Sequence, residues 1–224
     1  YVGRHGPDLL SVGDPWFRGL DMIYGPDGGV FLSDWSDTGE CHDQDGIHRS
    51  SGRIYKITYG DTVLPKFTDL TQLDNASLVP LLSDANEWLA RQARRVLVDR
   101  GVSGQAPGII TELKMEFGRQ RTLAGRLRAI WALHSVGGAD PGWLLQRLIP
   151  HTKDANEYIR SWAVRLLADE VWARGRRPMS QETQTKTAET LVTLARTEAS
   201  TSIVRLYLAS ALQQMPLDAR FALA

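Results

Sequence analysis

The pattern of apolar and polar positions divides the chain into a short β-rich part and a long helical part. Two apolar runs, at 19–24 and 30–35, flank the turn sequence Gly-Pro-Asp-Gly-Gly at 25–29. This arrangement predicts a β-hairpin, because proline presets φ at the second turn position and glycine accepts a positive φ. A third run, at 53–59, alternates apolar and polar residues and ends at Gly60. We therefore predict three antiparallel strands, which form an incomplete sheet with two unpaired edges.

The chain from Asn75 onward carries a helical pattern that repeats at an interval of 70 residues. Asp84-Ala85-Asn86-Glu87-Trp88-Leu89 recurs as Asp154-Ala155-Asn156-Glu157-Tyr158-Ile159. In both copies Asp or Asn is placed to cap a helix, and the glutamate favours its positive end. An interval of 70 fits two units of about 35 residues, which is near the length of a two-helix solenoid repeat. We predict four stacked helical pairs at 75–100, 107–136, 141–173 and 181–214, and the start of a fifth helix at 217–224.

Apolar residues recur down one face of each predicted helix. In the third pair they form a stripe of Tyr158, Ile159, Trp162, Ala163, Leu166 and Leu167. A stripe of this kind needs a neighbour to cover it, so the pairs are expected to stack on one another. Tryptophans on such stripes, namely Trp88, Trp131 and Trp162, are predicted to lie in the core.

These elements predict a mainly α protein, in which a HEAT-like α-solenoid follows a small antiparallel β segment. An antiparallel meander that ends in a polar loop is the unit of a β-propeller blade. The predicted domains are a partial β-propeller blade over 1–60, a linker over 61–74 and HEAT-like helical repeats over 75–224.

The amino-acid composition of the chain limits the kinds of partner that we expect it to bind. Lys plus Arg and Asp plus Glu both number 26, and this balance argues against nucleic acid as a partner. One cysteine excludes an internal disulfide framework. No apolar run approaches the roughly 18 residues of a membrane span. The chain begins with Tyr1, without an initiator methionine or an apolar leader, so we expect it to be a piece of a longer protein.

The loop between the second and third strands carries most of the candidate chemistry. Its possible metal ligands are Cys41, His42, Asp43, Asp45 and His48. Thiolate, imidazole and carboxylate groups bind zinc and other transition metals, but the spacing matches no tight template. The alternative is that these polar groups satisfy the backbone of a long loop.

Carboxylates, histidines and arginines around the same loop could also line the mouth of a propeller, where loops commonly supply binding sites. The candidate ligand-binding residues are Asp34, Asp37, His42, His48 and Arg53. The alternative is that Asp34 and Asp37 cap turns and that Arg53 pairs with one of them. No nucleophile elbow, P-loop, dinucleotide fingerprint or zinc-protease motif occurs, so the catalytic residues are unknown.

The helical part is rich in arginine, at Arg91, Arg94, Arg95, Arg126, Arg128, Arg160 and Arg165. These side chains could form a basic ridge. Because acidic residues are interspersed among them, we expect a solvated face with local ion pairs.

The hairpin sequence at 25–35, followed after a polar loop by Gly52-Arg53-Ile54-Tyr55-Lys56-Ile57, resembles the last propeller blade of a known family. That family is the large membrane-bound dehydrogenase-like proteins of planctomycetes and verrucomicrobia. In it, a propeller similar to that of soluble quinoprotein sugar dehydrogenases is followed by HEAT-like repeats, and many members end in a c-type haem module. The order of blade and then helical repeats is the order seen here.

The resemblance implies a fragment of a larger exported protein that is periplasmic or associated with the cell envelope. The parent protein is then expected to use PQQ and calcium, with c-type haem on a separate module. No cofactor is expected in the present segment, and its Cys-x-x-Cys-His haem motif is absent. The helical repeats are expected to serve as a scaffold or docking surface for a protein partner or for other domains of the same chain. The alternative is an enzyme fragment whose Asp/His loop contributes to a sugar or polyol oxidation site completed by upstream blades.

Overall fold

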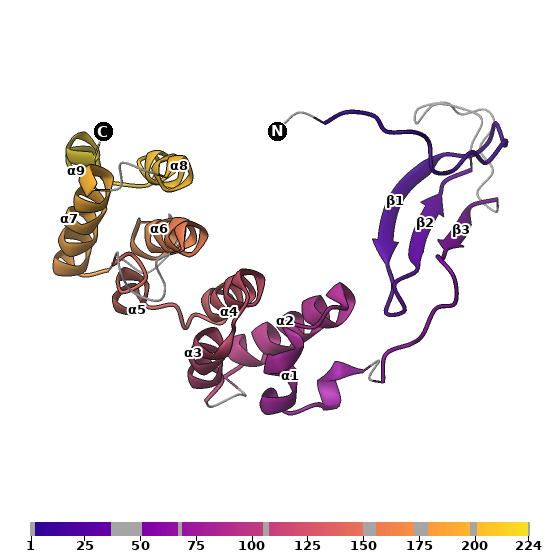
Figure 1. Cartoon of the computed structure of the whole chain (residues 1–224), viewed down its shortest axis with the longest axis horizontal. Helices are drawn as coiled ribbons and strands as arrows, with labels where there is room; N and C mark the ends of the chain where they lie inside the picture. The colour runs from indigo at the N-terminus through magenta and orange to yellow at the C-terminus, as the bar shows by residue number, and fades with distance from the viewer. Residues whose placement is uncertain are drawn as a thin grey trace. The chain divides into compact units, whose positions relative to one another are not determined.

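The computed structural model describes residues 3–36, 51–66, 69–104, 108–149, 156–172, 179–197 and 201–223. The described chain is mainly helical, with nine α-helices and one small antiparallel sheet on the N-terminal side, which confirms the predicted fold class (Figure 1). It separates into two compact units. The first comprises Tyr1–Asp69 with Asn86–Leu89, and the second comprises Leu70–Ala85 with Ala90–Ala224.

The sheet in the first unit has three strands in the order of the sequence. They are β1 (Gly19–Tyr24), β2 (Val30–Asp34) and β3 (Arg53–Ile57), and both pairings are antiparallel. The predicted hairpin between β1 and β2 is confirmed. In its turn Gly28 has a φ of 79°, and the amide of Gly25 donates to the carbonyl of Gly29 at 2.8 Å.

This sheet buries few of its apolar side chains. Leu32 at the centre of β2 is buried, whereas Leu20, Met22 and Ile23 of the edge strand β1 are exposed. Successive strand residues point to opposite faces, so β1 presents apolar groups on both sides. Such a small sheet gains little from the hydrophobic effect, as expected for an incomplete sheet.

The second unit is built from helical pairs. Its elements are η1 (Leu70–Gln72), α1 (Asn75–Leu81), α2 (Glu87–Val102), α3 (Ile109–Arg119), α4 (Leu123–Ser135), α5 (Pro141–Leu145), α6 (Glu157–Trp172), α7 (Gln181–Thr197), α8 (Ser202–Ala211) and α9 (Leu217–Leu223). The first three residues of α2 belong to the first unit. None of these described helices combines the length and apolarity that a membrane span requires.

The repeat of 70 residues corresponds to α2 and α6, which have the same length of 16 residues and begin at Glu87 and Glu157. In both copies the asparagine caps the helix. The side-chain oxygen of Asn86 accepts from the amide of Trp88 at 3.0 Å, and that of Asn156 accepts from the amide of Tyr158 at 2.9 Å. The shared sequence is therefore a shared helix start.

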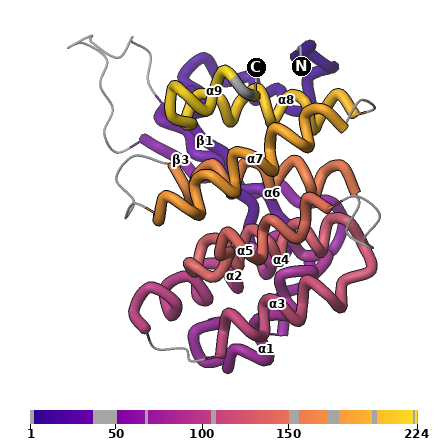
Figure 2. Tube along the Cα trace, turned by 90° about the vertical axis from the view of Figure 1, so that its left-hand side faces the viewer, coloured from indigo at the N-terminus to yellow at the C-terminus, as the bar shows by residue number. Residues whose placement is uncertain are grey.

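Consecutive pairs pack in two layers (Figures 1 and 2). The helices α4, α6 and α8 contact one another in order and form what we call the inner layer, whereas α5, α7 and α9 lie in the outer layer together with α3. The helix α6 contacts four neighbours, α4, α5, α7 and α8. The side chains that these contacts bury completely include Ile130, Leu133, Leu144, Ile159, Ala163, Leu167, Leu191 and Val204.

The predicted stripe of α6 is only partly in the core. Ile159, Ala163, Leu166 and Leu167 are buried, but Tyr158 is 43% exposed and Trp162 is half-buried. Residues 158, 162 and 165 follow one another at helical spacing, so they share the one side of α6 that its neighbours do not cover. Trp131 of α4 and Trp88 of α2 are also half-buried, so the prediction of a core position is wrong for all three tryptophans.

We predict that Ile130→Ala destabilises the helical unit by about 2–5 kcal/mol, because a fully buried isoleucine leaves a cavity between packed helices. Val102→Ala is the control, since Val102 is exposed and its loss should change the free energy of unfolding by less than about 0.5 kcal/mol. Urea unfolding followed by helical circular dichroism measures both. Equal losses in the two variants would contradict the assigned core.

Candidate functional site

The structure brings together two of the candidate ligand-binding residues, Asp34 at the end of β2 and Arg53 at the start of β3. They are direct partners in the antiparallel register. The guanidinium of Arg53 contacts one oxygen of Asp34 through Nε at 2.8 Å and Nη2 at 2.7 Å. This confirms the expected pairing of Arg53 with one of the loop aspartates.

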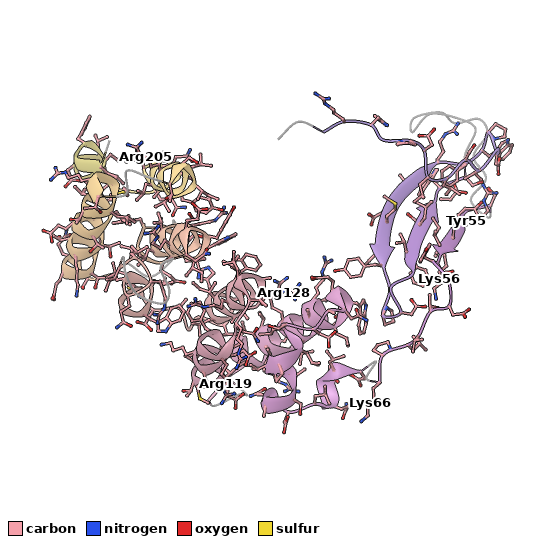
Figure 3. The ribbon with its side chains drawn as sticks, viewed as in Figure 1. Tyr55, Lys56, Lys66, Arg119, Arg128 and Arg205 are labelled. Carbon is pink, nitrogen blue, oxygen red and sulfur yellow. The ribbon has the colours of Figure 1, made fainter. Side chains whose placement is uncertain are left out.

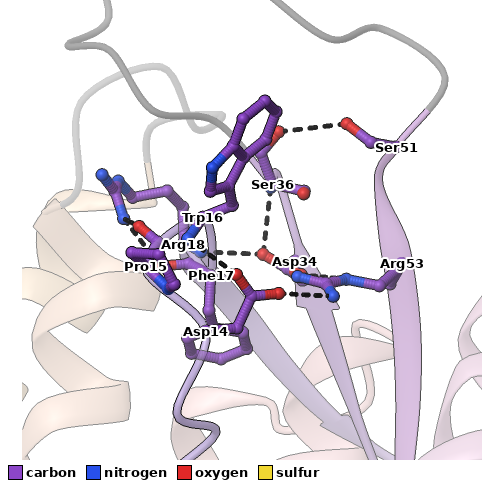
Figure 4. Close-up of polar contacts among 9 residues, drawn as sticks. All are labelled: Asp14, Pro15, Trp16, Phe17, Arg18, Asp34, Ser36, Ser51 and Arg53. Atoms are coloured by element: carbon purple, nitrogen blue, oxygen red, sulfur yellow. Dashed lines mark hydrogen bonds and ion pairs between the residues drawn. The ribbon is translucent and has the colours of Figure 1, made fainter.

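Asp34 also caps a turn, as the alternative interpretation predicts (Figure 4). Its second carboxylate oxygen accepts from the amide of Arg18 at 2.7 Å and from the amide of Ser36 at 3.0 Å. Ser36 has a φ of 49°, a left-handed conformation that costs a residue with a side chain roughly 1–2 kcal/mol. The Asp34 side chain is fully buried. Both carboxylate oxygens of Asp34 therefore already have partners within the protein.

Arg53 links this turn to the preceding loop. Its Nη1 donates to Asp14 at 2.7 Å, and Asp14 in turn accepts from the amide of Trp16 at 2.9 Å. One guanidinium thus bridges two carboxylates from segments far apart in the sequence (Figure 4). Planar guanidinium groups suit such multiple pairing.

The surroundings keep both carboxylates ionised. Burial by itself raises the pKa of Asp34, but the amide of Arg18 and the guanidinium of Arg53 hold that pKa below its usual value. The pKa of Asp14 is lowered by the amide of Trp16 and by Arg53. Their pairing therefore stabilises the fold above the pKa of an unfolded aspartate, about 4, and is lost as pH falls through the lower folded values.

The other candidates in the loop, Asp37, Cys41, His42, Asp43, Asp45 and His48, lie outside the described residues. The metal-site and ligand-site predictions for them stay predictions. Within the described ranges no cluster of three or more His, Cys, Asp or Glu side chains is placed to hold a metal ion.

The inner layer of helices carries a row of aromatic residues that sequence reasoning missed. Trp131 of α4 contacts Trp162 of α6 with ring centroids 5.0 Å apart, and Trp162 contacts Tyr207 of α8 at 6.1 Å. Both contacts are edge-to-face, and all three side chains are half-buried. We call these three residues the aromatic row; it joins three consecutive helical pairs.

A hollow of about 460 Å³ lies beside the aromatic row, between α6 and α8. Its lining includes Arg165 of α6 and Leu206, Tyr207 and Ser210 of α8. Leu206 is 65% exposed, so an apolar side chain at the border of the hollow is open to solvent. The hollow is within the volume range of ligand pockets.

The arginines of the helical part do not form a uniformly solvated face. Arg128 of α4, labelled in Figure 3, donates to the carbonyls of Leu82 and Asp84, and Arg160 is buried. Arg126 and Arg147 stack on Phe117, with guanidinium carbons 4.5 and 5.2 Å from the ring centroid. Burial lowers the pKa of both, and the charge of Arg126 lowers that of Arg147 further. The expectation of a solvated face is therefore wrong for Arg126, Arg128 and Arg160.

We predict that Arg53→Met weakens the sheet at pH 7 and reduces its sensitivity to acid, because Asp14 and Asp34 then lose their shared cation. The matched control is Arg18→Gln, since Arg18 donates to Asp34 through its backbone amide, which this substitution keeps. Urea titrations followed by NMR signals of β2 and β3, at pH 7 and pH 3, give the midpoints. The wild type and Arg18→Gln should lose stability between these pH values, and Arg53→Met should lose less. A drop in Arg53→Met as large as in the wild type would contradict the assignment.

Comparison with known proteins assigns no family to the chain. No protein-family model, curated protein or solved structure matches this chain. The resemblance to the dehydrogenase-like family stays a prediction.

Proposed function

We propose that the helical pairs are a scaffold that docks a protein through the inner layer, within a larger exported dehydrogenase-like protein. The observation that carries this proposal is the aromatic row with the adjoining hollow. Aromatic side chains and arginine are the residues that most often dominate protein interfaces. Here Trp162 contacts both Tyr207 and Arg165, the two aromatic side chains are half-buried, and Arg165 is exposed.

The packing of the helices holds the aromatic row in place. Each residue of the aromatic row stands on a helix whose opposite side is packed against its neighbours. A partner that binds such a surface needs to order few side chains, which lowers the entropic cost of association. The exposed Leu206 adds apolar area that a partner would remove from water.

We predict that Leu206→Glu abolishes capture of the partner, because it introduces a charge into the apolar part of the docking surface. Met115→Glu is the matched control, since Met115 is a similarly exposed apolar residue of α3 in the outer layer. The immobilised chain and both variants are incubated with a cell-envelope extract, and captured proteins are quantified by mass spectrometry. The proposal expects a protein retained by the wild type and Met115→Glu and lost from Leu206→Glu. Identical captured sets, or no captured protein, would overturn it.

A second candidate function is a contribution to sugar or polyol oxidation by the loop that carries His42 and His48. One observation favours it. Asp34 and Arg53 lie in the two strands that flank this loop, and their ion pair joins these strands. The ends of the loop are therefore held at a fixed separation. Rigidly anchored loops are common supports for catalytic side chains.

This second candidate predicts that His42→Ala and His48→Ala lower calcium- and PQQ-dependent sugar oxidation at least about tenfold in the full reading frame that contains this chain. His5→Ala, outside the loop, is the control. Oxidation that both loop variants leave unchanged would eliminate this candidate.

A further inference from the structure

The hollow between α6 and α8 has a floor of small side chains. Ala168 of α6 and Ala211 of α8 are both buried at its base. Alanine at both positions leaves a depression where larger residues would fill the interhelical groove. Tyr207 and the exposed Leu206 border it, so an apolar group can enter from solvent.

Arg165 supplies a positive charge at the border of the hollow. Its guanidinium carbon lies 5.5 Å from the centroid of the Trp162 ring, so the cation is held against an aromatic surface. The side chain is exposed, and it forms no ion pair with a carboxylate in the part of the chain that the structure describes. A stacked guanidinium keeps its edge donors available for a carboxylate.

A negative charge also lies near the hollow. Asp169, on the next turn of α6, accepts a hydrogen bond from the side chain of Gln214 at 2.8 Å. Gln213, Gln214 and Ser210 bring neutral polar groups to the lining. Such amides and hydroxyls can pair with the backbone of an extended peptide.

The geometry favours a peptide over a single strand of nucleic acid. Nucleic-acid strands bind grooves that combine several cations with open aromatic faces for base stacking. Among the described residues that line the hollow, Arg165 is the only cation. The rings of the aromatic row contact one another edge to face, with interplanar angles of 68° and 60°, and Arg165 lies over Trp162.

We propose that this hollow, which we call the α6–α8 site, binds an extended acidic peptide segment of the docking partner. An acidic side chain pairs with Arg165, and a neighbouring apolar side chain enters the depression beside Tyr207 and Leu206. The assignment rests on the docking function proposed above and specifies the chemistry of the partner.

The test uses three fluorescein-labelled peptides that repeat Ser-Leu-X, where X is glutamate, glutamine or lysine. At low salt, fluorescence anisotropy should show the glutamate peptide binding about tenfold more tightly than the glutamine peptide, since one charge-assisted hydrogen bond adds about that much. Arg165→Gln should remove this preference, and Arg165→Lys should retain part of it. Asp169→Asn should tighten binding of the glutamate peptide.

Ser210→Trp is the second variant, because Ser210 is exposed and an indole there would fill the hollow without disturbing the core. It should block binding of every peptide. Equal affinity for the glutamate and glutamine peptides, with both blocked by Ser210→Trp, would overturn the acidic preference and leave the docking function standing. Binding that Ser210→Trp does not change would overturn the α6–α8 site. Tighter binding of labelled oligothymidine, lost in Arg165→Gln, would assign the face to nucleic acid and overturn the proposal.

Discussion

The enclosure of α6 by four other helices is the constraint on which the helical unit depends. Ile159, Ala163 and Leu167 are completely buried by these neighbours, and no single helical pair could cover them. Because only one side of α6 remains open, the residues on that side are the ones this central helix presents to solvent. Tyr158, Trp162 and Arg165 occupy it, so the packing that stabilises the unit also selects its exposed surface.

Polar contacts fix how the pairs align. His134 of α4 lies 2.9 Å from Glu170 of α6, and both side chains are largely buried. Arg128 reaches from α4 to the carbonyls that follow α1. Unlike apolar contacts, the hydrogen bonds of Arg128 are directional and are lost when a helix slides or rotates, so they favour one alignment of the stack.

The three strands and the four helical pairs could be predicted from the sequence because their signals are local. A turn sequence, an asparagine cap and an apolar period each act within a few residues. The exposure of Trp162 could not be predicted in this way. An apolar stripe indicates that a helix is covered, but which edge of the stripe stays open depends on α4 and α8, which lie far away in the sequence. The same limit applies to Arg126 and Arg147, which both stack on Phe117 of α3.

For the candidate site in the sheet, the sequence allowed two interpretations. The residue types of Asp34 and Arg53 suit either a ligand or an internal ion pair. The antiparallel register places the two residues directly opposite each other, and they form the ion pair. The two amides that Asp34 also binds depend on the fold of the chain around Arg18 and Ser36, which no local pattern indicated.

Site-specific crosslinking can show whether the inner layer docks a partner. A photo-crosslinking amino acid is placed at Gln213, beside the α6–α8 site, and at Thr111, an exposed residue of α3 in the outer layer. After illumination in the native cell envelope, a docking surface on the inner layer should give a covalent adduct of one defined mass from position 213 and none from position 111. Adducts of equal yield from both positions, or an adduct from position 111 alone, would contradict it.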